Sequence, residues 1–183
     1  MGFLADGYPE IRYTEEKGEV SAEYRAAGTP PDYTAPGGTE YHYLSTRLST
    51  DGLFGLYKNR MGPAPAGTGT HFHTTMSESF FVLSGWLRAY DGERWVDLAE
   101  GDYLYVPPGG LHAFGNISGA PAEFLMLFAP GGAREGYFEG LRHMAEMTDT
   151  ERTEFLVRHD SFFTDRTGPD QQTWADRAAE LRR

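Results

Sequence analysis

Short apolar segments separated by turn residues follow one another from residue 40 to residue 129, and this pattern constrains the fold more than any other feature of the chain. Turn pairs such as Asp51-Gly52 and Asp91-Gly92 divide the segments, and such pairs favour tight reversals of the backbone. The chain also holds 12 Phe, 11 Tyr and 3 Trp. Short strands, frequent turns and an aromatic interior are typical of a β-barrel or jelly roll. The predicted strands are 40–45, 53–61, 70–73, 79–83, 87–90, 95–97, 103–106, 112–116 and 123–128.

The segments on either side of this pattern differ from it and from each other. Residues 1–38 are polar and are interrupted by Pro30-Pro31 and Pro36-Gly37-Gly38, which predicts an irregular arm. The arm either crosses to a partner subunit or wraps the surface of its own. We therefore expect an arm over 1–38, a β-barrel over 39–132 and a helical extension over 133–183.

The extension has helical periodicity. Apolar residues recur at three- and four-residue spacing after Pro130-Gly131-Gly132, which predicts an amphipathic helix near 133–147. A second helix is predicted over 150–159, with Thr148 or Asp149 as its cap, and a third over 171–181.

Composition excludes several classes of protein. The 183 residues suffice for one domain with a substantial core. A net charge of -11 argues against nucleic acid as a partner, because its phosphates require a basic surface. The absence of cysteine rules out a thiolate metal site and agrees with a reducing compartment. No signal peptide and no apolar run of about twenty residues is present, so we expect a cytoplasmic protein without a membrane partner.

Four residues have the chemistry and the spacing of metal ligands. His71 and His73 are two residues apart, so both point to one face of a strand. Glu78 begins the next apolar run, and His112 follows a Pro-Pro-Gly-Gly turn. Three imidazoles and one carboxylate suit one divalent transition metal ion, and Fe, Ni, Co, Mn, Cu and Zn all stay open. We interpret the remaining histidines as structural, namely His42, His143 and His159.

These residues lie in two motifs that resemble those of the cupin superfamily. Residues 71–85 fit His-x-His-x4-Glu-x6-Gly, and residues 101–116 fit Gly-x5-Pro-x-Gly-x2-His-x3-Asn at every fixed position. Pro65 stands where the family usually has a glycine six residues before the first histidine, which affects the entry turn and no ligand. The resemblance implies an all-β, double-stranded β-helix (jelly-roll) core with His71, His73, Glu78 and His112 as metal ligands.

A closer resemblance is to the small single-domain bacterial quercetin 2,3-dioxygenases. They too follow the last barrel strand with a Pro-Gly-Gly segment and an aromatic-bearing helix, as in residues 129–138 here. This resemblance implies a metal-dependent dioxygenase that binds a small aromatic or enolic substrate as an anion and uses dioxygen, with Glu78 as both ligand and catalytic base. Two alternatives stay open: a metal-dependent isomerase, cyclase or lyase, and a cupin that binds a small ligand without turnover.

The side chains that line the substrate site follow from the alternation of strand residues. If Glu78 faces the interior, Phe80 and Val82 do so as well, and Phe114 follows His112 inward. On the last strand, alternation alone does not decide between Phe124, Met126 and Phe128 on one side and Leu125 and Leu127 on the other. An apolar lining around one metal is usual for a small-molecule site. The predicted substrate-binding residues are Phe80, Val82, Phe114, Met126 and Phe128.

The opposite alternation places apolar residues on the outside of the barrel. Phe72, Phe81 and Leu83 would face outward and form an apolar patch large for a monomer. We therefore expect a homodimer, with the arm before Glu40 or the tail contributing to its interface.

Overall fold

The computed structural model describes residues 7–164 and Ala179, and its strands follow the predicted pattern closely. The helix predicted over 171–181 lies outside the described residues except for Ala179. The strands are β1 (Tyr33–Thr34), β2 (Glu40–Ser45), β3 (Gly55–Met61), β4 (Ala66–Gly67), β5 (His71–Phe72), β6 (Ser77–Ser84), β7 (Trp86–Tyr90), β8 (Trp95–Ala99), β9 (Tyr103–Val106), β10 (Ala113–Asn116), β11 (Ala122–Ala129) and β12 (Phe162–Phe163).

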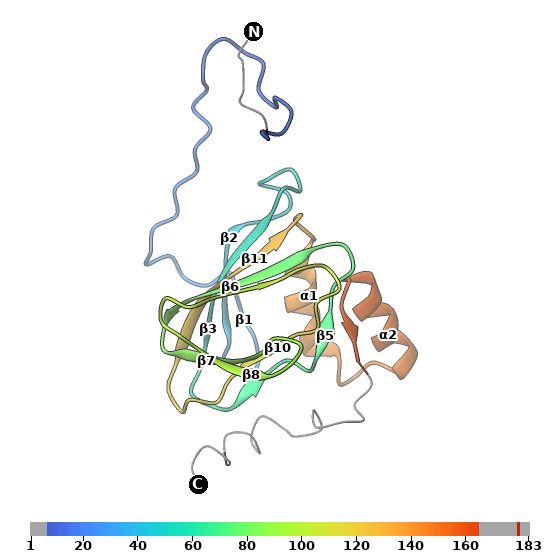
Figure 1. The fold of residues 1–183 in the computed structure, drawn as a ribbon. Coiled ribbons are helices and arrows are strands. Elements are labelled where there is room, and N and C mark those ends of the chain that lie inside the picture. Colours follow the sequence, from blue (N-terminus) through green and yellow to red (C-terminus); the bar gives the residue numbers. More distant parts are fainter. Residues whose placement is uncertain (1–6, 165–178, 180–183) are drawn as a thin grey trace.

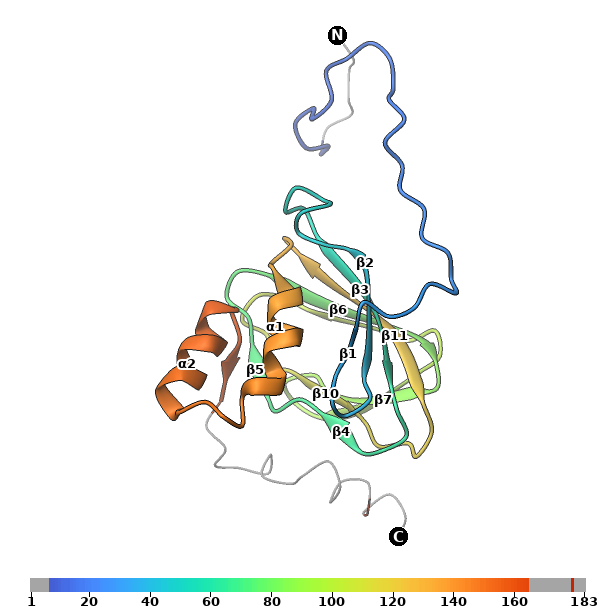
Figure 2. The same ribbon diagram turned by 180° about the vertical axis from the view of Figure 1, so that it is seen from behind.

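Two antiparallel sheets face each other and enclose the core (Figures 1 and 2). The larger sheet has the order β1-β2-β3-β11-β6-β9, and the smaller has the order β4-β10-β7-β8. A third, two-stranded sheet joins β12 to β5. This arrangement is a double-stranded β-helix, so the predicted all-β jelly-roll core is confirmed.

Strand β11 lies at the centre of the larger sheet and settles the choice that the sequence left open. It pairs with β3 on one side and with β6 on the other. Phe124, Met126 and Phe128 are buried inside the barrel, while Leu125 and Leu127 are half-buried on the other face. The interior is therefore aromatic, because the rings of β11 pack against those of the neighbouring strands.

The helical extension is shorter and more broken than its periodicity predicts. The single helix predicted near 133–147 is wrong in extent: α1 covers Arg134–Gly140 and a 3-10 turn, η1, covers Leu141–His143. Gly140 explains the break, because a Cβ there would lie 2.5 Å from Cε2 of Phe155. The close approach of α2 (Asp149–Arg158) thus requires a glycine, which is a poor helix former.

Helix α2 begins where the sequence predicts. The Thr148 hydroxyl accepts a hydrogen bond from the backbone N–H of Glu151, and the Glu151 carboxylate accepts one from the N–H of Thr148. This reciprocal capping box fixes the start of the helix. Both α1 and α2 lie on one side of the barrel, next to β5 (Figures 1 and 2). Among the described residues, no helix is long and apolar enough to span a membrane.

The arm joins the barrel earlier than expected. Strand β1 pairs with β2 through Tyr33 and Tyr41, whose rings stack with centroids 5.8 Å apart. An ion pair between Arg25 and Asp32, 2.8 Å long, holds the arm where it reaches β1. The described residues before it extend away from the barrel (Figures 1 and 2).

Asp160 holds the tail against the barrel. Its carboxylate accepts hydrogen bonds from the backbone N–H and the hydroxyl of both Thr74 and Thr75, with donor–acceptor distances of 2.5 to 2.9 Å. Asp160 also has a positive φ of 50°, which aspartate tolerates better than most residues. Burial alone would raise the pKa of Asp160, but the four hydrogen bonds outweigh it and keep that pKa below its ordinary value.

We expect Asp160→Asn to lower the free energy of unfolding by about 1–2 kcal/mol at pH 7, because an amide cannot accept all four bonds. The carboxylate stabilises the fold above the unfolded-state pKa near 4, and this contribution is lost as pH falls through the lower folded-state pKa. Denaturant titrations of the wild type and the variant should therefore converge in acid. Asp51→Asn is the control, because Asp51 has a similar φ of 52°; an equal loss there would contradict the prediction.

Candidate metal centre

The four predicted ligands come from chain segments that belong to different sheets. His71 is on β5, His73 follows that strand, and Glu78 is near the start of β6. His112 immediately precedes β10 and pairs with His71 through reciprocal N–H···O hydrogen bonds of 2.9 Å. The backbone ladder thus fixes the spacing between the two chain segments that supply the imidazoles.

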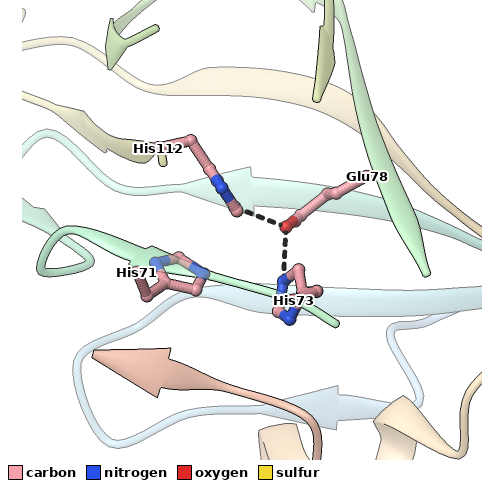
Figure 3. Close-up of side chains that lie close together, drawn as sticks. All are labelled: His71, His73, Glu78 and His112. Carbon is pink, nitrogen blue, oxygen red and sulfur yellow. Dashed lines mark hydrogen bonds and ion pairs between the residues drawn. The ribbon is translucent and has the colours of Figure 1, made fainter. Parts of the chain in front are cut away.

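The four side chains converge on one point inside the barrel (Figure 3). One potential ligand atom from each lies within 4.8 Å of every other, and all four residues are buried. Glu78 Oε2 is 3.0 Å from His73 Nε2 and 2.8 Å from His112 Nε2. The structure therefore brings together every residue that the sequence predicts as a ligand.

Each imidazole is oriented by a backbone carbonyl. His71 Nδ1 lies 2.9 Å from the carbonyl oxygen of Gly69, and His112 Nδ1 lies 3.0 Å from that of Gly110. His73 Nδ1 bonds to the carbonyl oxygen of Asp160. Because a carbonyl only accepts, Nδ1 carries the proton in all three rings. Each Nε2 is then available as a metal ligand, with a second shell that fixes tautomer and ring plane.

The same geometry explains why the centre suits a cation. The Nε2 atoms of His73 and His112 face the Glu78 carboxylate, which also only accepts. Both nitrogens of these two rings therefore face acceptors, and each ring must bind a further proton or share a cation with Glu78. A divalent transition metal satisfies the three imidazoles and the carboxylate together, so the donor set fits one such ion.

The electrostatics of the cluster favour the metal-binding forms of His71 and Glu78, and they couple His112 to the Glu78 carboxylate. Burial, with His112 nearby, lowers the pKa of His71 to about 3, so this ring is neutral. Burial alone would raise the pKa of Glu78, but hydrogen bonds from His112 and His73 outweigh it and hold that pKa below its usual range. Burial would likewise lower the pKa of His112, but its hydrogen bond to Glu78 raises it. A neutral imidazole and an ionised carboxylate are the ligating forms.

The predicted substrate-binding residues all face the barrel interior. The Phe80 ring lies against Phe114, with centroids 4.8 Å apart, and 6.3 Å from that of His112. Phe128 meets the His73 ring edge-on at 6.0 Å. Val82 and Met126 are buried in the same core. Phe80 and Phe128 thus lie beside imidazoles of the cluster, with Phe114 against Phe80, and contact of the five residues with a substrate stays a prediction.

The tail contributes two residues to this centre that the sequence analysis missed. The carbonyl of Asp160 orients His73, and the Phe163 ring stacks on His71 with centroids 4.9 Å apart. Asp160 lies 87 residues beyond the histidine that it orients, Phe163 lies farther along the chain, and no spacing rule connects either residue to the first motif. The one signal was the polar Thr74-Thr75 bend, which needs acceptors for its hydroxyls. His42, His143 and His159 lie outside the cluster.

Comparison with known proteins agrees with the fold. The cupin domain family matches residues 60–128, which include all four predicted ligands. An uncharacterised protein of Methanocaldococcus jannaschii is 28% identical over 107 residues, which span 50% of this chain and 85% of the relative.

Solved structures were compared with the chain as well. A predicted oxalate decarboxylase of Thermotoga maritima superposes with a TM-score of 0.51 at 19% identity, covering 60% of this chain and 99% of that protein. A sugar phosphate isomerase of the cupin superfamily from Silicibacter pomeroyi gives a TM-score of 0.45 at 25% identity, covering 55% and 69% of the two chains. At such identities the likeness concerns the fold alone. Residues 60–128 therefore match the cupin domain family, and the β-sheet core has the double-stranded β-helix fold.

Proposed function

We propose that this protein is a metal-dependent dioxygenase that acts on a small aromatic or enolic substrate. The observation that carries the proposal is the buried cluster of three imidazoles, each oriented by a carbonyl, around one carboxylate. When bound, the divalent ion supplies a Lewis acid that holds a substrate enol, phenol or carboxylate as its anion. His71, His73 and His112 would hold this ion together with Glu78.

Glu78 has a second role in this proposal, as the base that takes the substrate's hydroxyl proton. Its carboxylate is fully buried and has no charged partner in the described part of the chain other than the two imidazoles. With an ion bound, Nε2 of His73 and of His112 would be its ligands and would no longer donate to Glu78. The carboxylate is then free to accept a proton from a hydroxyl beside it.

The surroundings of the centre favour an uncharged, flat substrate body. Phe80, Phe114 and Phe128 form an aromatic wall next to the imidazoles. Arg60 pairs with Glu40 and Glu123 on the outer face, and Arg88 pairs with Asp97, so neither arginine serves the interior. A phosphorylated substrate would need such cations. Oxidative cleavage by dioxygen takes its electrons from an electron-rich substrate, which an enol or phenol provides.

Metal content is the first test. We expect protein purified without chelator to hold about one transition metal ion per chain, and His112→Ala to hold far less. Elemental analysis measures both, and removal of the metal should lower the melting temperature, because an ion that binds only the folded state stabilises it. His143→Ala is the control, since this histidine is exposed on η1. Full activity in metal-free protein would overturn the proposal.

The role of Glu78 is tested by Glu78→Gln at full metal occupancy. Loss of a general base lowers turnover by about 10²–10⁴-fold, and reconstituted metal should not restore it, because an amide cannot accept the proton. Oxygen uptake with a panel of enols and phenols gives the rate. Glu154→Gln, exposed on α2, is the matched control. Near-native turnover in the metallated variant would reduce Glu78 to a ligand, and product formation without oxygen uptake would favour an isomerase or lyase.

We also propose a homodimer formed through the outer face of β6 and β9. Phe81 is 40% exposed there, beside Tyr103 and Tyr105 at 60% and 53%, and β9 is an edge strand of its sheet. Of the outward residues predicted for an interface, Phe72 is instead covered by Phe162 of the tail, with ring centroids 5.3 Å apart. The apolar surface for a partner is therefore the part around Phe81.

Light scattering at micromolar concentration should give twice the chain mass for the wild type. Phe81→Lys should shift the protein to the monomer, because a buried lysine without a partner opposes association. Val157→Lys, on the half-exposed face of α2, is the control. A wild-type monomer would reject the dimer, and a dimeric Phe81→Lys variant would place the interface elsewhere.

A further inference from the structure

A cavity of about 160 Å³ lies inside the barrel beside the aromatic wall. Phe114, Phe124 and Met126 line one side, and the segment 66–68 at β4 lines another. Asn59 of β3 lies in the wall between Tyr41 and Phe124, which are its register partners on β2 and β11. The cavity lining contains no charged side chain among the described residues.

Asn59 is the unusual member of this wall. It is fully buried, yet neither its Oδ1 nor its Nδ2 has a hydrogen-bonding partner in the described part of the protein. A buried amide without partners destabilises a fold. Its neighbours along the inward face of β3 are Tyr57 and Met61, so an apolar residue would suit this position better. The Asn59 amide thus lowers the stability of the fold, so its presence is better explained by a role in binding.

Asn116 shows what a structural asparagine looks like in the same barrel. It is equally buried, but its Nδ2 donates to the carbonyls of Gly62 and Ala120. Its Oδ1 accepts from the N–H and the hydroxyl of Ser118. The Nδ2 and Oδ1 atoms that hold a turn in Asn116 have no hydrogen-bond partner in Asn59 within the described residues.

We propose that Asn59 recognises an uncharged, ring-sized molecule that carries a hydrogen-bond donor and an acceptor side by side. The amide offers one donor and one acceptor on the same edge, which matches a lactam, a cis-amide or an enol beside a ketone. The aromatic rings of Tyr41 and Phe124 flank it and suit a flat molecule. A ligand without the complementary donor and acceptor would leave the buried amide unpaired and would therefore bind more weakly. Asn59 is thus a specificity-determining residue.

Access to Asn59 requires some adjustment of the wall. Its polar atoms are covered in this structure, and Met61 and Met126 are the flexible side chains of the lining. Unbranched thioether side chains adapt to an occupant at little cost.

This inference rests on the proposed function in one respect: we assign the molecule as the end of the substrate farther from the metal. Phe128 lies in register with Glu78, and Phe124 lies in register with Asn59. Phe124 and Phe128 are four residues apart on β11, so Asn59 and Glu78 lie about 13 Å apart along the direction of that strand. The cavity is smaller than the roughly 300–1,000 Å³ of sites for drug-sized ligands. A single ring suits it better than the three rings of a flavonol.

Binding of 2-pyridone, a flat lactam, tests the proposal directly, with toluene as the probe of similar shape without the polar edge. Calorimetry on the protein as purified should show that 2-pyridone binds and that Asn59→Leu weakens it about tenfold or more. Toluene should bind the variant at least as well as the wild type. In NMR spectra, the side-chain amide signals that Asn59→Leu removes should be those that shift when 2-pyridone is added.

Stability separates recognition from a structural role. Asn59→Leu should leave the melting temperature unchanged or raise it by about 2–4 °C, because it removes an unpartnered amide. Asn116→Leu, the matched control, should lower it. A fall in Asn59→Leu like that in Asn116→Leu, equal 2-pyridone affinity in the variant, or no binding of 2-pyridone to the wild type would each overturn the proposal. Metal content and oxygen uptake are measured separately, so failure of the dioxygenase proposal is distinguishable from failure of this one.

Discussion

The hydrogen bond from each imidazole Nδ1 to a backbone carbonyl is the interaction on which the candidate centre depends. It determines which nitrogen carries the proton and therefore which one faces the interior. Two of the three carbonyls, those of Gly69 and Gly110, lie two residues before the histidine they orient. Neighbouring residues thus fix the ring orientations of His71 and His112. The orientation of His73 depends instead on the carbonyl of Asp160, 87 residues away.

This difference links the tail to the chemistry of the barrel. The Asp160 carboxylate fixes the bend at Thr74 and Thr75, and its carbonyl orients His73. Asp160 therefore holds both the bend that follows β5 and the predicted ligand His73. Arg134 supports it from α1, since its guanidinium donates to the carbonyl of His159 and lies 4.0 Å from the Tyr137 ring centroid. Loosening the tail should then affect metal binding as well as stability.

The sequence predicts those parts of the site whose geometry is local. The pair His71 and His73, a helix cap at Thr148 or Asp149 and the strand pattern follow from short-range rules that tertiary contacts did not override. The inward face of β11 was undecided, because both sets of residues are apolar, and only pairing with β3 and β6 determines it. The break at Gly140 depends on the close approach of Phe155, and the role of Asp160 depends on a contact across the chain. Neither contact produces a periodic pattern in the sequence from which it could be predicted.

The two buried asparagines show that residue type and burial alone do not reveal the role of a polar side chain. Both Asn59 and Asn116 occupy inward positions of strands, and Asn116 also belongs to the second motif. Only the hydrogen-bond partners distinguish them: one asparagine is saturated and the other has none. A saturated amide stabilises a turn, whereas an unpartnered one lowers stability wherever it is retained for binding. The metal cluster and Asn59 are thus two buried polar regions whose hydrogen-bonding groups the rest of the described chain does not saturate.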